Sequence, residues 1–196
     1  MDKIIKSKQT KNGAEFWSLH AIRRRWPVNW PVQLIGYIRN KTGRQEVCTS
    51  FAELSLILRG NGHLKTSGGK TLAIEAPCAF FKPVNQPVTL IPNSPWEEWL
   101  FRFPPPLLQT LRQTEPEEDA CYHRQLQPQT ERIYQYLQML RILLERPELN
   151  ACIDEIDRLA DLILLTVLTG IPPMQHGHGV LEKILAVREI LDTRFR

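Results

Sequence analysis

The sequence predicts an α+β fold whose N-terminal half is mainly β and whose C-terminal half is helical. Across residues 16–103, runs of strand length are separated by glycines and prolines, and residues 53–59 alternate leucines on one face. From residue 104 onward, apolar residues recur with the 3.6-residue period of amphipathic helices. Strands do not alternate with helices, which disfavours a doubly wound parallel sheet. The pattern favours an antiparallel sandwich or small barrel.

The expected strands follow from the turn residues that bound them. Gly60-Asn61-Gly62 is a tight connection suited to a hairpin, and Ser67-Gly68-Gly69-Lys70 indicates a second hairpin turn. Prolines mark most of the remaining boundaries. Strands are therefore expected over residues 33–39, 53–59, 63–66, 71–75, 78–82, 88–91 and 97–103.

The helices follow from the apolar period and its breaks. Residues 107–113 could form a short helix after three prolines, and residues 130–146 fit an amphipathic helix that Pro147 ends. A longer helix is expected over residues 151–169, with Asn150 as a plausible N-cap.

The helix over residues 151–169 is apolar around much of its circumference, so it should pack on two surfaces. One surface can be the β region, and the other is either a helix of this chain or a partner protomer. An exposed leucine stripe would otherwise favour aggregation. We therefore expect a homodimer through this helix, with Ile156, Leu159, Leu162, Ile163 and Leu165 at the interface.

Composition narrows the class of protein. The chain has 196 residues, of which 42% are hydrophobic and 23% charged, so disordered, collagen-like and disulfide-scaffold classes are excluded. No apolar run is long enough to span a bilayer, and the N-terminus lacks the apolar core of a secretory signal. The four cysteines form no C-x-x-C and are expected to be small buried hydrophobes. We expect a cytoplasmic protein that does not contact membranes.

Positive charge is concentrated at the N-terminus. Residues 1–50 carry ten Lys and Arg against three Asp and Glu, a net +7, whereas the whole chain is +4. The excess lies in the lysine-rich arm and in Arg23-Arg24-Arg25. Such a patch could touch nucleic acid or an acidic partner, but a solvated tail and a charged loop are the alternative.

Sequence signatures of catalysis are weak. No G-x-S-x-G, P-loop or G-x-G-x-x-G motif occurs, and His176-Gly177-His178 has no third metal ligand nearby. We therefore expect no enzymatic activity, no cofactor and no metal. Glu97 and Glu98, flanked by Trp96 and Trp99, carry the groups that a sugar or polar-ring site uses, although core and edge packing also explains the tryptophans.

Residues 53–103 resemble a known family. The order E-L-S-L-I-L-R-G-N-G-H-L, a Gly-Gly hairpin, A-P-C-A-F-F-K-P and P-W-E-E-W-L-F-R-F is similar to the ligand-binding domain of the arabinose-operon regulator (AraC) family. The leucine-rich helix, I-P-P-M and V-L-E-K-I-L-A-V-R-E-I-L-D-T-R-F extend the resemblance over most of residues 30–196. It implies a cupin-like antiparallel β-barrel followed by an α-helical dimerisation region.

The resemblance also divides the chain. In the family, the last segment opens a C-terminal DNA-binding domain with two helix-turn-helix motifs, which this chain lacks. The apolar pattern is still running at Phe195, so we expect the natural protein to continue beyond Arg196. The expected parts are a basic arm (1–15), a cupin-like effector-binding barrel (16–104), a helical dimerisation region (105–175), and a linker with the start of the truncated helix-turn-helix domain (176–196).

Three departures from the family bear on function. The run from Lys82 to Pro87 replaces the usual P-G-x-x-H, and only His63 follows Gly60 where metal-binding cupins have H-x-H. Pro77-Cys78 also replaces the usual glycine-aspartate. These departures disfavour a metal-dependent cupin enzyme and leave a modified effector pocket open.

The resemblance implies an effector-sensing and dimerisation domain of a bacterial AraC-type transcription regulator. Its ligand would be a small polar molecule, a sugar being one option, and it would contact DNA only through the missing domain. A stand-alone cupin-type enzyme (isomerase or oxygenase) and a structural module with a filled barrel are the alternatives. The candidate ligand residues are Tyr37 and Trp99 for stacking, Arg39 and Arg102 for pairing with a carboxylate or phosphate, and Glu98 for binding hydroxyls. Alternation alone leaves open which face of strand 97–103 lines the cavity.

Overall fold

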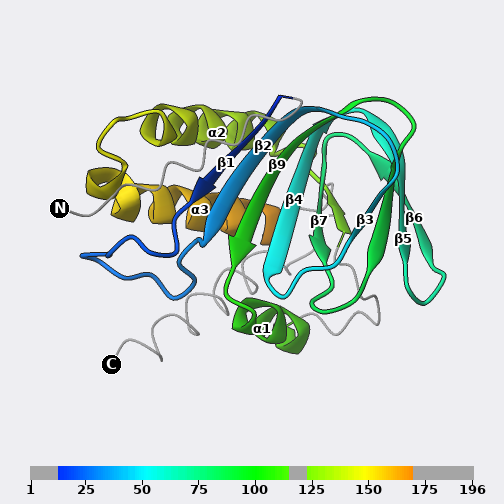
Figure 1. Ribbon diagram of the computed structural model, residues 1–196, viewed down its shortest axis with the longest axis horizontal. Coiled ribbons are helices and arrows are strands. Elements are labelled where there is room, and N and C mark those ends of the chain that lie inside the picture. The colour runs from blue at the N-terminus through cyan, green and yellow to red at the C-terminus, as the bar shows by residue number, and fades with distance from the viewer. Residues whose placement is uncertain (1–12, 115–122, 170–196) are drawn as a thin grey trace, which may run out of the picture.

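The computed structural model describes residues 13–114 and 123–169, which form three layers (Figure 1). A six-stranded antiparallel sheet is the middle layer, with a four-stranded sheet on one face and two helices on the other. The α+β class with a mainly β N-terminal half is thus confirmed. Within the described residues, no helix is long and apolar enough to cross a lipid bilayer.

The elements match most of the expected ranges. The strands are β1 (Ala14–Ser18), β2 (Leu34–Lys41), β3 (Gln45–Val47), β4 (Ala52–Arg59), β5 (Asn61–Thr66), β6 (Thr71–Glu75), β7 (Cys78–Lys82), β8 (Val88–Pro92), β9 (Trp96–Phe103) and β10 (His123–Gln125). The helices are α1 (Pro106–Thr114), α2 (Thr130–Leu144), the 3-10 helix η1 (Leu149–Cys152) and α3 (Ile153–Leu168). Three short strands, β1, β3 and β10, were not among the expected ranges, and β10 extends the sheet from within the region expected to be helical.

The large sheet has the order β1-β2-β9-β4-β7-β10, and the small sheet has the order β3-β8-β5-β6. Among the described residues the two antiparallel sheets share no ladder and are not closed into a barrel, an arrangement consistent with the expected cupin-like fold. The connection at Gly60 is not the predicted hairpin, because β4 pairs with β7 and β9 whereas β5 pairs with β6 and β8. The chain changes sheets there, and a Cβ on Gly60 would lie 2.5 Å from the Pro95 carbonyl oxygen. The predicted hairpin at residues 67–70 is confirmed by the pairing of β5 with β6.

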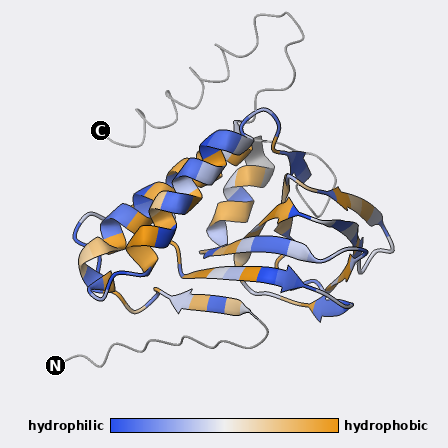
Figure 2. Ribbon diagram, turned by 90° about the horizontal axis from the view of Figure 1, so that it is seen from above, coloured by the Kyte–Doolittle hydropathy of each residue, from blue (hydrophilic) through white to orange (hydrophobic). Residues whose placement is uncertain are grey.

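Alternation along the central strands separates two cores. On β9, Trp99, Phe101 and Phe103 join the core beneath α2 and α3, whereas Trp96 joins the core between the two sheets. Figure 2 shows that α2 and α3 mix hydrophobic and hydrophilic residues along their length, as expected for helices with one buried face. The large sheet is therefore covered on both faces.

The last described helix differs from expectation in two respects. It begins at Ile153 after η1, with Cys152 rather than Asn150 at the N-cap position. Three of the five expected dimer residues, Ile156, Leu159 and Ile163, are buried in the chain's own helix–sheet core. A side chain that already fills this core cannot contact a partner, so that part of the prediction is corrected. The other two, Leu162 and Leu165, are each 42% exposed.

The loop between β1 and β2 is fixed to α3 by two aspartates. Asp157 is buried and accepts hydrogen bonds from Arg24 Nε (2.9 Å) and from the Val32 backbone amide (3.0 Å). Asp154 accepts the backbone amides of Arg25 and Trp26. The middle arginine of the basic triplet therefore serves the fold rather than a charged surface, and the lysine-rich arm lies outside the described residues.

The cysteines are not uniformly buried. Cys78 and Cys152 are buried, as predicted, but Cys48 is exposed. Cys121 and the pair His176 and His178 lie outside the described residues.

Candidate functional site

Charged side chains lie between the two sheets, where an apolar core is usual. They project from the interior face of the large sheet, because Glu53 on β4 pairs with Arg102 on β9 and with Lys82 on β7. The groups that form this interior ion network are Lys41, Glu53, Ser55, Lys82, Glu98 and Arg102. Burying charges in this way is costly unless they are paired. The network is therefore a strong departure from an ordinary sandwich core.

Glu98 is the inner anchor of the network and has no exposed surface. Its Oε2 accepts a hydrogen bond from Lys41 Nζ at 2.6 Å, and its Oε1 accepts one from Ser55 Oγ at 2.7 Å. Lys82 Nζ lies 3.7 Å from the same Oε1. Burial alone would raise the pKa of Glu98, but Lys41 and Lys82, with the hydrogen bonds, lower it to about 2. Glu98 is therefore a carboxylate at neutral pH.

Glu53 joins the inner part of the network to its open end. Its Oε1 accepts a hydrogen bond from Lys82 Nζ, and its Oε2 accepts one from Arg102 Nε at 2.6 Å. Burial would raise the pKa of Glu53, but Lys82 and Arg102 lower it below its usual value. The charges thus alternate in sign from Lys41 to Arg102. The Lys41, Glu98, Lys82 and Glu53 side chains are at most 3% exposed, whereas Arg102 is 34% exposed and ends the network at the surface.

The two lysines titrate differently because of their neighbours. Burial would lower the pKa of Lys82, but attraction to Glu98 and Glu53 raises it above its usual value. Burial lowers the pKa of Lys41 more than Glu98 alone raises it, and repulsion from Lys82 adds to the lowering. Lys82, which lies between two carboxylates, therefore keeps its proton more strongly than an ordinary lysine, whereas Lys41 keeps its proton less strongly.

The five ligand residues predicted from the sequence do not form one site. Glu98 and Arg102 face the interior and belong to the network, which resolves the facing of strand 97–103. Tyr37 and Trp99 lie on the helix-facing side, with ring centroids 4.9 Å apart, so they pack with each other. Arg39 is exposed near the end of β2.

Sequence reasoning missed Lys41, Glu53, Ser55 and Lys82. Glu53 and Ser55 occupy alternate positions of an otherwise apolar strand, and Lys82 ends the apolar run C-A-F-F, so polar residues in buried strands were the available signal. Lys41 could not be found this way. If side chains alternated strictly from Tyr37 onward, Lys41 would lie on the face of the large sheet that the helices cover. A bulge between Ile38 and Lys41 instead turns the lysine toward the space between the two sheets.

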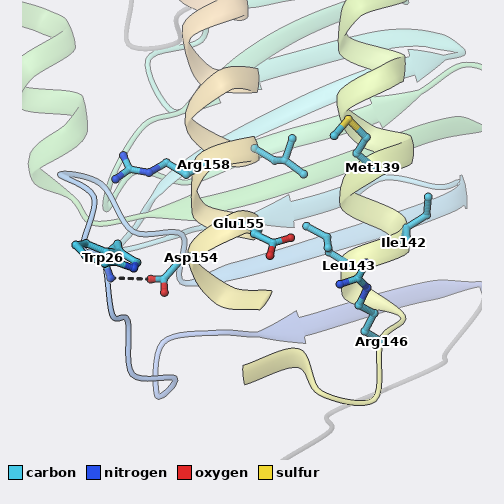
Figure 3. Close-up of a pocket in the computed structure, with 9 residues that line it drawn as sticks. Trp26, Met139, Ile142, Leu143, Arg146, Asp154, Glu155 and Arg158 are labelled. Carbon is cyan, nitrogen blue, oxygen red and sulfur yellow. Dashed lines mark hydrogen bonds between the residues drawn. The ribbon is translucent and has the colours of Figure 1, made fainter. Parts of the chain in front are cut away.

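A hollow lies away from the interior ion network, between α2, α3 and the loop that follows β1 (Figure 3). It is an open groove of about 630 Å³ whose apolar floor is flanked by Arg146, Asp154 and Arg158. Trp26 and Ile142 are 71% and 60% exposed beside it. No cluster of three or more His, Cys, Asp or Glu side chains able to hold a metal ion occurs in residues 13–114 and 123–169.

The two-sheet sandwich, its interior ion network and the family comparison together define this chain as a ligand-binding domain. The family described as AraC-like ligand binding domain matches residues 33–165, more than half of the chain. The chain belongs to this family, as the sequence resemblance implied. A comparison with curated proteins finds no match.

The solved structures that match this chain share little sequence with it. YhaK from Escherichia coli is 12% identical with a TM-score of 0.41, covering 57% of this chain and 50% of that one. A mutant of the oxalate decarboxylase OxdC from Bacillus subtilis is 15% identical (TM-score 0.36), covering 50% and 26%. An ethanolamine utilization protein, EutQ, from Salmonella typhimurium is 15% identical (TM-score 0.33), covering 37% and 58%. The chain thus spans less than two thirds of each of these proteins.

Proposed function

We propose that this domain is the sensor of a cytoplasmic transcription regulator. In this proposal it binds a small polar effector at the open end of the interior ion network and controls an attached DNA-binding domain. The observation that carries the proposal is a continuous chain of buried charges whose one partly exposed member, among the described residues, is Arg102. A sandwich built only for stability gains little from buried ion pairs, since apolar residues of similar size do as well or better.

The geometry favours binding over catalysis. General acid–base catalysis is most efficient when the pKa of the catalytic group lies near the working pH. The pKa of Glu98 is about 2, and Lys82 and Arg102 keep the pKa of Glu53 below its usual value, so both carboxylates stay ionised and engaged. We therefore infer that the domain binds its ligand without transforming it.

The structure offers a physical route from the site to the helices. The Arg102 carbonyl accepts the Gln33 amide at 2.7 Å, and the neighbouring Val32 amide donates to Asp157 of α3. Arg24 joins both, because it donates to the Val32 carbonyl and to Asp157. A ligand that moves Arg102 would thus bias the loop that is fixed to α3. Such a change needs a different ligand affinity in the two arrangements.

Effector binding is tested by thermal denaturation of the 196-residue chain with a panel of sugars, carboxylic acids and phosphorylated metabolites. A ligand that binds only the folded state raises the melting temperature. At a ligand concentration of one hundred times Kd, it adds about 2.7 kcal/mol to the free energy of unfolding. We expect at least one compound to do so with wild type and to lose the effect in Arg102→Gln. Stabilisation that is unchanged in that variant would place binding elsewhere and contradict the proposal.

Dimerisation is proposed through the exposed apolar residues that remain on the helices. Leu162 and Leu165 of α3 are each 42% exposed, and Met139 and Ile142 of α2 are 54% and 60% exposed. Such residues are a liability on a monomer surface. The double variant Leu162→Glu, Leu165→Glu should shift the sedimentation coefficient from dimer to monomer.

The control for this double variant is Arg132→Gln, which changes charge at an exposed position near the start of α2. It should leave the association state unchanged. A wild-type chain that sediments as a monomer at every concentration tested would remove dimerisation from the proposed function.

A further inference from the structure

We propose that the effector carries an anionic group, a carboxylate or a phosphate, and that this group binds the guanidinium of Arg102 at the open end of the interior ion network. This inference rests on the proposed function and names the class of its ligand. Three observations carry it: the charge balance of the network, the use of its carboxylate oxygens, and the geometry at Arg102.

The network holds more positive than negative charge. Lys41, Lys82 and Arg102 supply three cations, whereas Glu53 and Glu98 supply two carboxylates. Ser55 is neutral, so the ionised network carries a net charge of +1. Charges interact strongly where water is excluded, and an uncompensated buried charge is unfavourable. A ligand anion at the network's end would bring its charge to zero.

The two carboxylates are at most 1% exposed, so a neutral polyol has little access to them. Glu53 offers one oxygen to Lys82 and the other to Arg102. Glu98 offers one oxygen to Lys41 and the other to Ser55. All four oxygens thus accept a hydrogen bond within the protein, and three of these bonds come from cations. Sugar hydroxyls bind well where the protein offers free hydrogen-bond acceptors. This network instead offers donors at Arg102, so it suits a ligand that supplies the acceptors.

Arg102 is placed to receive those acceptors. Its Nε donates to Glu53, which fixes the plane of the guanidinium, and its carbon lies 5.9 Å from the centroid of the Phe51 ring. Its side chain is 34% exposed, against at most 3% for the other charged members. A guanidinium held in this way presents its terminal amino groups as a fork, which matches a carboxylate or a phosphate. The carboxylates behind it are already paired, so they keep their partners when the anion binds.

The experiment compares matched anionic and neutral probes at constant ionic strength, by isothermal titration calorimetry on the 196-residue chain. One pair is glucose 6-phosphate and glucose, and the other is benzoate and benzamide. Inorganic phosphate and succinate serve as further anions without a neutral partner. We expect at least one anion to bind, and its neutral partner, where it has one, to bind at least tenfold more weakly. Arg102→Gln removes the excess charge and the fork, and should raise Kd for that anion at least tenfold.

The matched control is Arg59→Gln. Arg59 ends the neighbouring strand β4, but its side chain is 79% exposed and pairs with Glu97 at 3.2 Å. This variant loses the same charge outside the network and should leave Kd unchanged within twofold. Equal weakening by both variants would mean that only overall charge matters, and would overturn the inference.

The remaining outcomes separate this inference from the proposed function. Neutral probes that bind as tightly as their anionic partners, with binding weakened by Arg102→Gln, would overturn the anion class but retain the site. Failure of every probe of both classes to bind would overturn the inference, and failure of the wider metabolite panel as well would overturn the proposed function. Arg102 is partly exposed, so its variant should fold, which the wild-type-like circular dichroism spectrum of the unliganded variant would verify.

Discussion

Glu98→Gln should lower the free energy of unfolding by about 3–5 kcal/mol at pH 7, because it removes one partner of a buried ion pair. The substitution leaves Lys41 without its carboxylate and leaves Lys82 with Glu53 alone. Both ammonium groups are at most 3% exposed, so water cannot replace the lost partner. Urea denaturation followed by circular dichroism measures the change.

The adjacent residue provides the control for Glu98→Gln. Glu97 points to the other face of β9, is 18% exposed, and pairs with the highly exposed Arg59. Exposed pairs of this kind contribute about 0–1 kcal/mol, so Glu97→Gln should have little effect. Equal losses from the two neighbouring substitutions would mean that the interior network is not the source of the effect. Adding Lys41→Met to Glu98→Gln should restore part of the loss, because it removes the stranded charge.

Acid should erase the difference between wild type and Glu98→Gln. The pKa of Glu98 is lowered to about 2 in the folded protein, below its ordinary value of 4.5. A lowered carboxylate pKa contributes stability that is fully present above the unfolded pKa and is lost as pH falls toward the folded one. The two proteins should therefore converge in stability as the pH is reduced from about 4.5 toward 2.

Asp157→Asn should destabilise the chain by about 3 kcal/mol, because it leaves a largely buried arginine without its carboxylate. The Arg24 side chain is only 11% exposed, and its Nε donates to Asp157. Burial raises the pKa of Asp157 more than Arg24 lowers it, so the ion pair by itself adds little. The loss comes from stranding the guanidinium, whose terminal amino groups keep their bonds to the carbonyls of Leu19, Ile22 and Val32.

Asp154→Asn is the matched control on the same helix. Asp154 accepts two backbone amides of the same loop in an exposed setting, and asparagine keeps one acceptor oxygen. Its loss should be about 1 kcal/mol or less. If Asp157→Asn proved as mild as Asp154→Asn, the loop would not depend on the buried pair, and the route from Arg102 to α3 would lose its support.

The spacing of apolar residues predicted most of the fold, because it repeats every two residues in the central strands and every 3.6 residues in the helices. The alternation of residues 53–59 and the helical period of residues 130–146 both survive in the structure as β4 and α2. The sheet change at Gly60 could not be read in this way. A short glycine turn suits a hairpin equally well, and strand partners are set by contacts far away in the sequence.

The candidate site was predicted only in part, for a related reason. Glu98 and Arg102 were found because they stand in one polar–aromatic strand, but their partners come from β2, β4 and β7. Lys41 reaches the site through a bulge, which shifts alternation by one residue and leaves no clear mark in the sequence. Tyr37 and Trp99 were assigned to the ligand site although they lie on the helix-covered face. Alternation divides the residues of a strand between two faces but does not say which face the helices cover.

In the proposed function, the ligand binds at the open end of the interior ion network rather than in the groove between α2 and α3. Backbone amide NMR shifts of the 196-residue chain, titrated with the tightest-binding compound of the metabolite panel, test it directly. We predict that the largest changes fall on Glu53, Lys82 and Arg102. Largest changes at Trp26, Ile142 and Arg158, which line or border the groove, would contradict the account and move the binding site to the helices.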